Sequence, residues 1–96
     1  MPDTITQVSD LLHQVAETHH VVFAITEGAD ADWASWYSDW LVNLSPLTQL
    51  LGANPVRSEL TYLLVTLDKA FTQEAPSGRW EDFYASRLIE HFAARS

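Results

Sequence analysis

The sequence contains no cysteine, and it has only three glycines and four prolines among its 96 residues. Without cysteine, the chain can form no disulfide scaffold, no cysteine-ligated zinc site or iron–sulfur cluster, and no thiol nucleophile. The scarcity of glycine and proline argues against a turn-rich all-β fold. Hydrophobic residues make up 47% of the chain, which argues against disorder. We therefore expect one folded domain over residues 1–96.

Basic residues are also few: five Lys and Arg stand against 13 Asp and Glu, which gives a net charge of −8. This balance makes a nucleic-acid backbone a poor partner. The first basic residue is Arg57, and the segment before it carries a charge of −7. In the simplest interpretation the acidic residues keep the protein soluble. In two others, they attract a basic protein partner or imitate nucleic acid in a basic protein groove.

Long apolar runs are missing as well. The longest stretch without a charged residue, 40–56, contains Ser45-Pro46, Gly52 and Asn54-Pro55, all of which interrupt helices. We therefore expect no membrane span. The N-terminal residues show neither the basic nor the apolar region of a signal peptide, and so we expect a cytoplasmic location.

Apolar residues recur at steps of three and four along most of the chain, which is the spacing of amphipathic helices. The pattern predicts an all-α fold: a compact bundle of four amphipathic helices, at about 4–25, 33–44, 55–72 and 79–94, with a short connecting helix at about 46–51. The β-branched pair Val21-Val22 leaves a strand over 21–26 as an alternative. Near the centre of the core we expect Trp36, Trp40, Leu63, Leu64, Leu67, Leu88 and Phe92.

Several residues have the properties of helix ends. Asp3 or Thr4 can cap the first helix, and Gly28 ends its pattern. Ser45 followed by Pro46 predicts the start of the short helix, and Gly52 predicts its end. Asn54 with Pro55 repeats the same start signal for the next helix.

His19 lies within the apolar stripe of the first predicted helix, so we expect its imidazole to be buried. A buried imidazole needs a hydrogen-bond partner. In one interpretation it is a core histidine bonded to a tyrosine, a glutamate or a backbone carbonyl. In the other it belongs to a ligand pocket, for which the candidate residues are His19, Trp36, Tyr37, Trp40, Glu59 and Tyr84. The rings among them could equally fill the core or anchor a protein interface.

His13, Glu17 and His20 have the i, i+4, i+7 spacing that places three potential metal ligands on one helix face. That face lies opposite the apolar stripe, so we expect a solvated polar surface, and we predict no metal or other cofactor. Arg57 lies in the first turn of a predicted helix, where a cation opposes the helix dipole. It should therefore pair with Asp39 or Asp32, or hold an anion at that helix end.

A second apolar feature suggests self-association. Tyr62 and Val65 lie away from the core stripe of their predicted helix, and Trp80 lies at the edge of its own. We expect a homodimer formed through these three residues. The leading functional hypothesis is a non-enzymatic protein-interaction or self-associating adaptor domain. The alternatives are a small-molecule-binding helical bundle with an aromatic pocket and an acidic mimic of nucleic acid.

Overall fold

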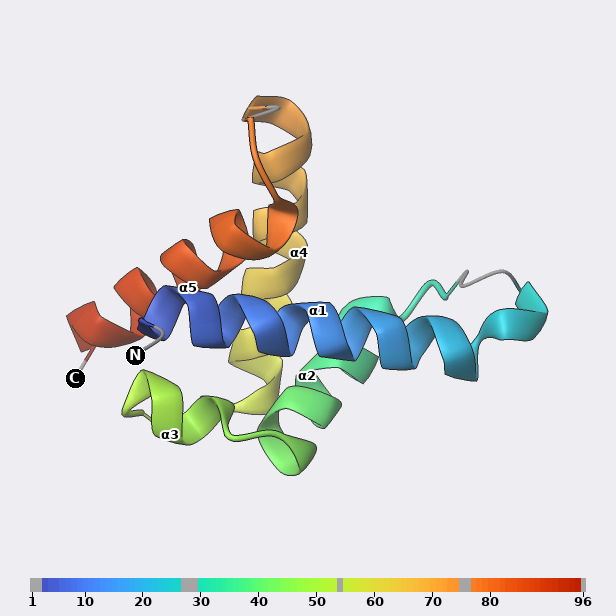
Figure 1. The fold of residues 1–96 in the computed structure, drawn as a ribbon, viewed down its shortest axis with the longest axis horizontal. Helices are drawn as coiled ribbons and strands as arrows, with labels where there is room; N and C mark the ends of the chain where they lie inside the picture. Colours follow the sequence, from blue (N-terminus) through green and yellow to red (C-terminus); the bar gives the residue numbers. More distant parts are fainter. Residues whose placement is uncertain (1–2, 27–29, 54, 75–76, 96) are drawn as a thin grey trace.

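The computed structural model describes residues 3–26, 30–53, 55–74 and 77–95, and all regular elements in these ranges are helical (Figure 1). In chain order they are α1 (Thr4–Val22), the 3-10 turn η1 (Ala24–Thr26), α2 (Trp33–Leu44), α3 (Leu47–Leu51), α4 (Arg57–Glu74) and α5 (Trp80–Arg95). The prediction of an all-α bundle with four long helices and one short connecting helix is confirmed.

The helix boundaries differ from the predicted ones by a few residues. The first helix ends at Val22 rather than near residue 25, and the chain then tightens into η1 instead of a strand. The fourth helix begins at Arg57, after Pro55, and extends to Glu74. The predicted roles of Gly28 and Asn54 lie outside the described residues.

Local capping explains three of these helix ends. Asp3 Oδ1 accepts a hydrogen bond from the Thr6 N–H at 2.7 Å, which satisfies one of the free donors at the start of α1. Ser45 Oγ accepts from the Leu47 N–H at 3.2 Å at the start of α3. Gly52 ends α3 in the left-handed conformation, with φ at 66°.

The helices pack in two main pairs, α1 against α5 and α2 against α4, and smaller contacts of α1 with α2 and α4 with α5 join the pairs. Figure 1 shows α4 running across the direction of α1, with the start of α1 and the end of α5 on the same side of the molecule. Two hydrogen bonds support the α1–α5 contact: Ser9 donates to Asp82 at 2.7 Å, and His13 Nδ1 donates to Glu81 at 3.0 Å.

The buried core is mainly aliphatic. Of the residues expected at its centre, four are buried: Leu64, Leu67, Leu88 and Phe92. The other three, Trp36, Trp40 and Leu63, are only partly buried and pack against the core from its edge. The two indoles are therefore less buried than predicted, because aliphatic side chains from α1, α4 and α5 already occupy the centre.

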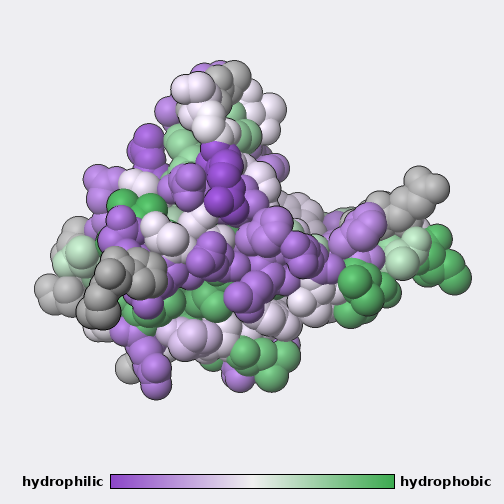
Figure 2. All heavy atoms as spheres, viewed as in Figure 1, coloured by the Kyte–Doolittle hydropathy of each residue, from purple (hydrophilic) through white to green (hydrophobic). Residues whose placement is uncertain are grey.

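The end of α1 and η1 form an arm that projects beyond the bundle (Figure 1). Val21, Val22 and Ile25 on this arm are 74%, 57% and 96% exposed, and Figure 2 shows hydrophobic side chains gathered at this end of the molecule. Val22 fits the apolar spacing of the first helix, but this end of α1 extends past the helices that could cover it. In the described ranges, no helix combines the length and apolarity needed to cross a membrane.

Candidate functional site

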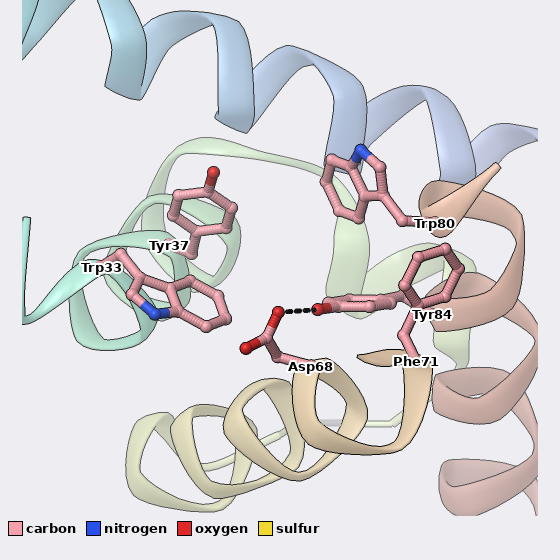
Figure 3. A pocket seen from close by; sticks show the side chains of 6 residues that line it. All are labelled: Trp33, Tyr37, Asp68, Phe71, Trp80 and Tyr84. Atoms are coloured by element: carbon pink, nitrogen blue, oxygen red, sulfur yellow. Dashed lines mark hydrogen bonds between the residues drawn. The ribbon is translucent and has the colours of Figure 1, made fainter. Parts of the chain in front are cut away.

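Three helices bring aromatic side chains to one cavity of about 350 Å³ (Figure 3). Two lining residues come from α2, two from α4 and two from α5: Trp33, Tyr37, Asp68, Phe71, Trp80 and Tyr84. We refer to these six residues as the aromatic pocket. Each helix contributes a pair of residues spaced three or four apart, so both members of a pair lie on the same helix face. Because α4 packs against both α2 and α5, the three faces meet.

Edge-to-face contacts fix the rings on two sides of the pocket. The Trp33 and Tyr37 rings have centroids 5.2 Å apart at an interplanar angle of 78°. The Trp80 and Tyr84 rings repeat this geometry at 5.1 Å and 76°. Figure 3 shows the two pairs facing each other, with Asp68 between them. Such contacts restrict the rings to defined orientations, and so the walls of the pocket are formed in advance.

Asp68 and Tyr84 supply the polar groups of the pocket. The Tyr84 hydroxyl donates to Asp68 Oδ1 at 3.2 Å. Burial raises the pKa of the Tyr84 phenol well above its ordinary value, and the adjacent Asp68 carboxylate raises it further. Burial also raises the pKa of Tyr37. Both phenols therefore keep their protons at neutral pH, and among the described residues Asp68 is the only charged one in the lining.

Asp68 has no basic partner within the part of the chain that the structure describes: its carboxylate contacts only the neutral Tyr84 phenol there. The carboxylate is also exposed, so that a ligand can reach it from solvent. The pocket thus combines apolar aromatic walls with one negative charge that no neighbouring side chain neutralises.

The structure brings three of the six predicted pocket residues into ring contact, because the His19 ring meets the rings of Trp36 and Tyr37. Tyr37 and Tyr84 line the aromatic pocket, whereas Trp40 packs against the core. Glu59 is 3.0 Å from His91 Nε2, which places it in a contact between α4 and α5 rather than beside His19.

His19 is buried as expected, but its partner differs from the predicted ones. Its Nε2 donates to Asp30 Oδ2 at 3.0 Å, which ties α1 to the segment before α2. The imidazole stacks on Phe23 with centroids 4.6 Å apart and meets the edges of Trp36 and Tyr37 at 5.1 and 5.3 Å. His19 is therefore a core histidine that joins two elements, with Asp30 in the role that sequence analysis assigned to Glu59 or a phenol.

The weak metal candidates on α1 are spread over an exposed surface. His13 donates to Glu81 on α5, and its other ring nitrogen contacts Glu17, while His20 is exposed. Across residues 3–26, 30–53, 55–74 and 77–95, no three His, Asp or Glu side chains are grouped so that they could hold a metal ion.

Arg57 and the self-association candidates also have defined positions. The Arg57 guanidinium is 3.7 Å from Asp39, one of the two partners suggested by the sequence, and both side chains are largely exposed. Tyr62 is 70% exposed and Val65 is 36% exposed on α4. Trp80 is partly buried, and its ring contacts Tyr84 in the aromatic pocket.

Four of the six residues of the aromatic pocket were not predicted to line a pocket: Trp33, Asp68, Phe71 and Trp80. The one available signal was the repeated pairing of large rings at i, i+4 on two helices, Trp33 with Tyr37 and Trp80 with Tyr84. No protein family, curated protein or solved structure in the comparisons matches this chain.

Proposed function

We propose that this protein is a non-enzymatic binding protein whose ligand site is the aromatic pocket. The observation that supports this proposal is the convergence of five rings and one carboxylate from three helices on one cavity of about 350 Å³. Small-molecule sites are concave, mostly apolar and contain a few placed polar groups, with volumes of roughly 300 to 1,000 Å³. The aromatic pocket has this composition, and its volume suits a small ligand or a single side chain of a partner protein.

The polar groups of the pocket favour binding over catalysis. A general base needs a pKa near the working pH and a free lone pair directed at the substrate. The pKa values of Tyr37 and Tyr84 are both raised, so neither phenol is a base at neutral pH. The buried histidine nearby, His19, is already bonded to Asp30. The lining can therefore orient a ligand, with Asp68 as its charged group and the two phenols as neutral groups.

The four tryptophans provide an internal test of this proposal. Trp33 and Trp80 line the pocket, whereas Trp36 and Trp40 do not. Titration with a panel of small fragments, followed by the indole N–H signals in NMR spectra, should shift the signals of Trp33 and Trp80 for the fragments that bind. Signals of Trp36 and Trp40 serve as controls. If no fragment shifts the first pair, or if all four signals move together, the proposed site is wrong.

A second proposal, self-association, is favoured by the exposure of Tyr62 and Val65 on the same helix. Exposed apolar residues three apart on a helix share one face and can be covered by a second copy of the chain. Sedimentation equilibrium at micromolar concentration should then give the mass of a dimer, and Tyr62→Glu should give the mass of one chain. A single-chain mass for the unmodified protein would eliminate this proposal.

A further inference from the structure

We propose that the group bound by the aromatic pocket is a methylated ammonium, such as a quaternary ammonium or a trimethylated lysine side chain. This inference rests on the proposed function, because it names the ligand chemistry of the same site. It is drawn from three properties of the pocket: its aromatic rings, its uncompensated carboxylate, and the predominance of rings over polar groups in its lining.

The rings favour a cation. An ammonium group within about 6 Å of a ring centroid is attracted by the negative face of the ring, and tryptophan gives the strongest attraction. The aromatic pocket contains two tryptophans on opposite sides, Trp33 from α2 and Trp80 from α5 (Figure 3). A cation bound in the pocket would lie among rings from α2, α4 and α5, and aromatic cages of this kind bind quaternary ammonium ions.

The charge of the pocket excludes the opposite class of ligand. Within the described ranges Asp68 is the only charged residue in the lining, and its carboxylate contacts no Lys, Arg or His there. An anion would meet this carboxylate without any basic side chain in the lining to compensate. The whole chain adds to the effect, because its net charge is −8. A cation would instead gain a favourable interaction with Asp68.

Hydration separates methylated from unmethylated cations. A primary ammonium brings three N–H donors and a guanidinium brings five, and each donor that loses water needs an acceptor. The five rings that form most of the lining of the aromatic pocket cannot replace the water around such donors as well as they can pack against methyl groups. A quaternary ammonium has no N–H donor, and its methyl groups pack against rings. It therefore loses the least on entering this pocket.

Comparison of choline with 3,3-dimethyl-1-butanol, its neutral isostere, tests the inference directly. The two molecules have nearly the same shape and differ in charge. Cation–π attraction and Asp68 together should make choline bind about tenfold more tightly or better, as measured by calorimetry or by the NMR shifts of the Trp33 and Trp80 indoles. Equal affinities with shifts at these two indoles would overturn the methylated-ammonium inference but leave the proposed binding site intact.

Matched variants test whether the cation binds beside Asp68. Asp68→Asn should weaken choline binding several-fold and leave the isostere unaffected. Asp10→Asn is the control: it changes the net charge by the same amount at an exposed position on α1. Trp33→Leu should also weaken choline binding, and Trp33→Phe should restore part of it. If Asp68→Asn binds choline as well as the unmodified protein does, the cation lies elsewhere and the inference is wrong.

A second binding comparison distinguishes a modified protein from a free small molecule as the source of the methylated ammonium. A peptide with a trimethylated lysine, an otherwise identical peptide with unmodified lysine, and free choline are compared side by side. Tighter binding of the trimethylated peptide than of the other two indicates a modified protein as the partner. Tighter binding of choline than of either peptide indicates a free small molecule. If none of the three shifts the Trp33 and Trp80 indoles, the inference is overturned.

Discussion

His19 on α1 and Asp30, which precedes α2, are joined through Nε2 and Oδ2 at 3.0 Å in a nearly buried contact. The imidazole also stacks on Phe23 and meets the edge of Trp36, so one side chain links the end of α1 to the start of α2. The His19–Asp30 pair therefore links α1 to the residues that lead into α2. It fixes the position of α2, and with it the wall of the aromatic pocket that Trp33 and Tyr37 form.

Replacement of His19 should therefore destabilise the fold. His19→Ala removes a buried ring and its hydrogen bond, which should lower the free energy of unfolding by about 2 to 4 kcal/mol, as for other large buried side chains. His20→Ala, at the exposed neighbouring position, should change it by less than about 0.5 kcal/mol. Urea denaturation measures both values. Similar losses in the two variants would show that the His19 contacts do not carry stability.

Asp30 makes the same link sensitive to acid. The hydrogen bond from His19 lowers the pKa of the Asp30 carboxyl. A lowered pKa in the folded state gives stability that is present above the unfolded value of about 3.9 and is lost as the pH falls through the folded value. Asp30→Asn should thus be less stable than the unmodified protein at neutral pH, with the difference shrinking below about pH 4.

Thermal melts across this acidic range measure the effect, with Asp10→Asn as a control for the loss of one carboxylate. Parallel curves for the unmodified protein and Asp30→Asn would contradict the prediction. The same melts at high salt test the mechanism, because the short, nearly buried Asp30–His19 contact should be screened less than exposed charges are.

How far the sequence alone predicts these features depends on whether they are local. Helix ends such as Asp3, Ser45 and Gly52 depend on neighbours within a few residues, and the structure places them as the sequence indicates. The burial of His19 follows from the apolar stripe around it. The identity of its partner does not follow, because Asp30 is eleven residues away in the sequence and its position relative to α1 depends on the tertiary fold.

The aromatic pocket depends even more on long-range packing. Trp33, Asp68 and Trp80 come from three helices, and they meet only because α4 packs against both α2 and α5. Periodicity gives the face of each helix but not the order in which helices pack. For this reason the sequence does not indicate that Asp68 and Trp80 lie in one pocket.

The contact between α1 and α5 should respond to pH in the opposite sense. The hydrogen bond to Glu81 raises the pKa of His13, although burial opposes the shift. A raised pKa gives stability that is present below the unfolded value of about 6.5 and is lost as the pH rises through the folded value. The pH titration of His13 by NMR should show this raised value, and Glu81→Gln should lower it.

Glu90→Gln, on an exposed part of the same helix, is the matched control and should leave the His13 titration unchanged. Thermal melts should show the unmodified protein losing stability between about pH 6 and pH 8, with a smaller loss in Glu81→Gln. An unchanged His13 pKa in Glu81→Gln would mean that Glu17, the other contact of this imidazole, carries the effect instead.

Gly52 tests the importance of a single backbone conformation. Its φ of 66° is in the left-handed region, and a Cβ added there would meet no atom within 4 Å. Gly52→Ala should therefore lower the free energy of unfolding by about 1 to 2 kcal/mol through backbone strain alone. Gly52→Asn should cost less, because asparagine tolerates this conformation. Equal losses for the two variants would point to packing rather than strain.

The Tyr84–Asp68 contact predicts a loss of stability at alkaline pH. Burial and the Asp68 carboxylate raise the pKa of Tyr84, so the unfolded phenol releases its proton near pH 10 while the folded phenol keeps it. Stability linked to Tyr84 is therefore complete below about pH 10 and falls as the pH rises above it.

Thermal melts from about pH 8 to pH 11 should show a smaller decline in stability for Tyr84→Phe than for the unmodified protein. Tyr62→Phe, at an exposed position, is the control and should decline like the unmodified protein. If the stability of Tyr84→Phe declines as much as that of the unmodified protein, the pKa of Tyr84 is not raised by its surroundings in the aromatic pocket.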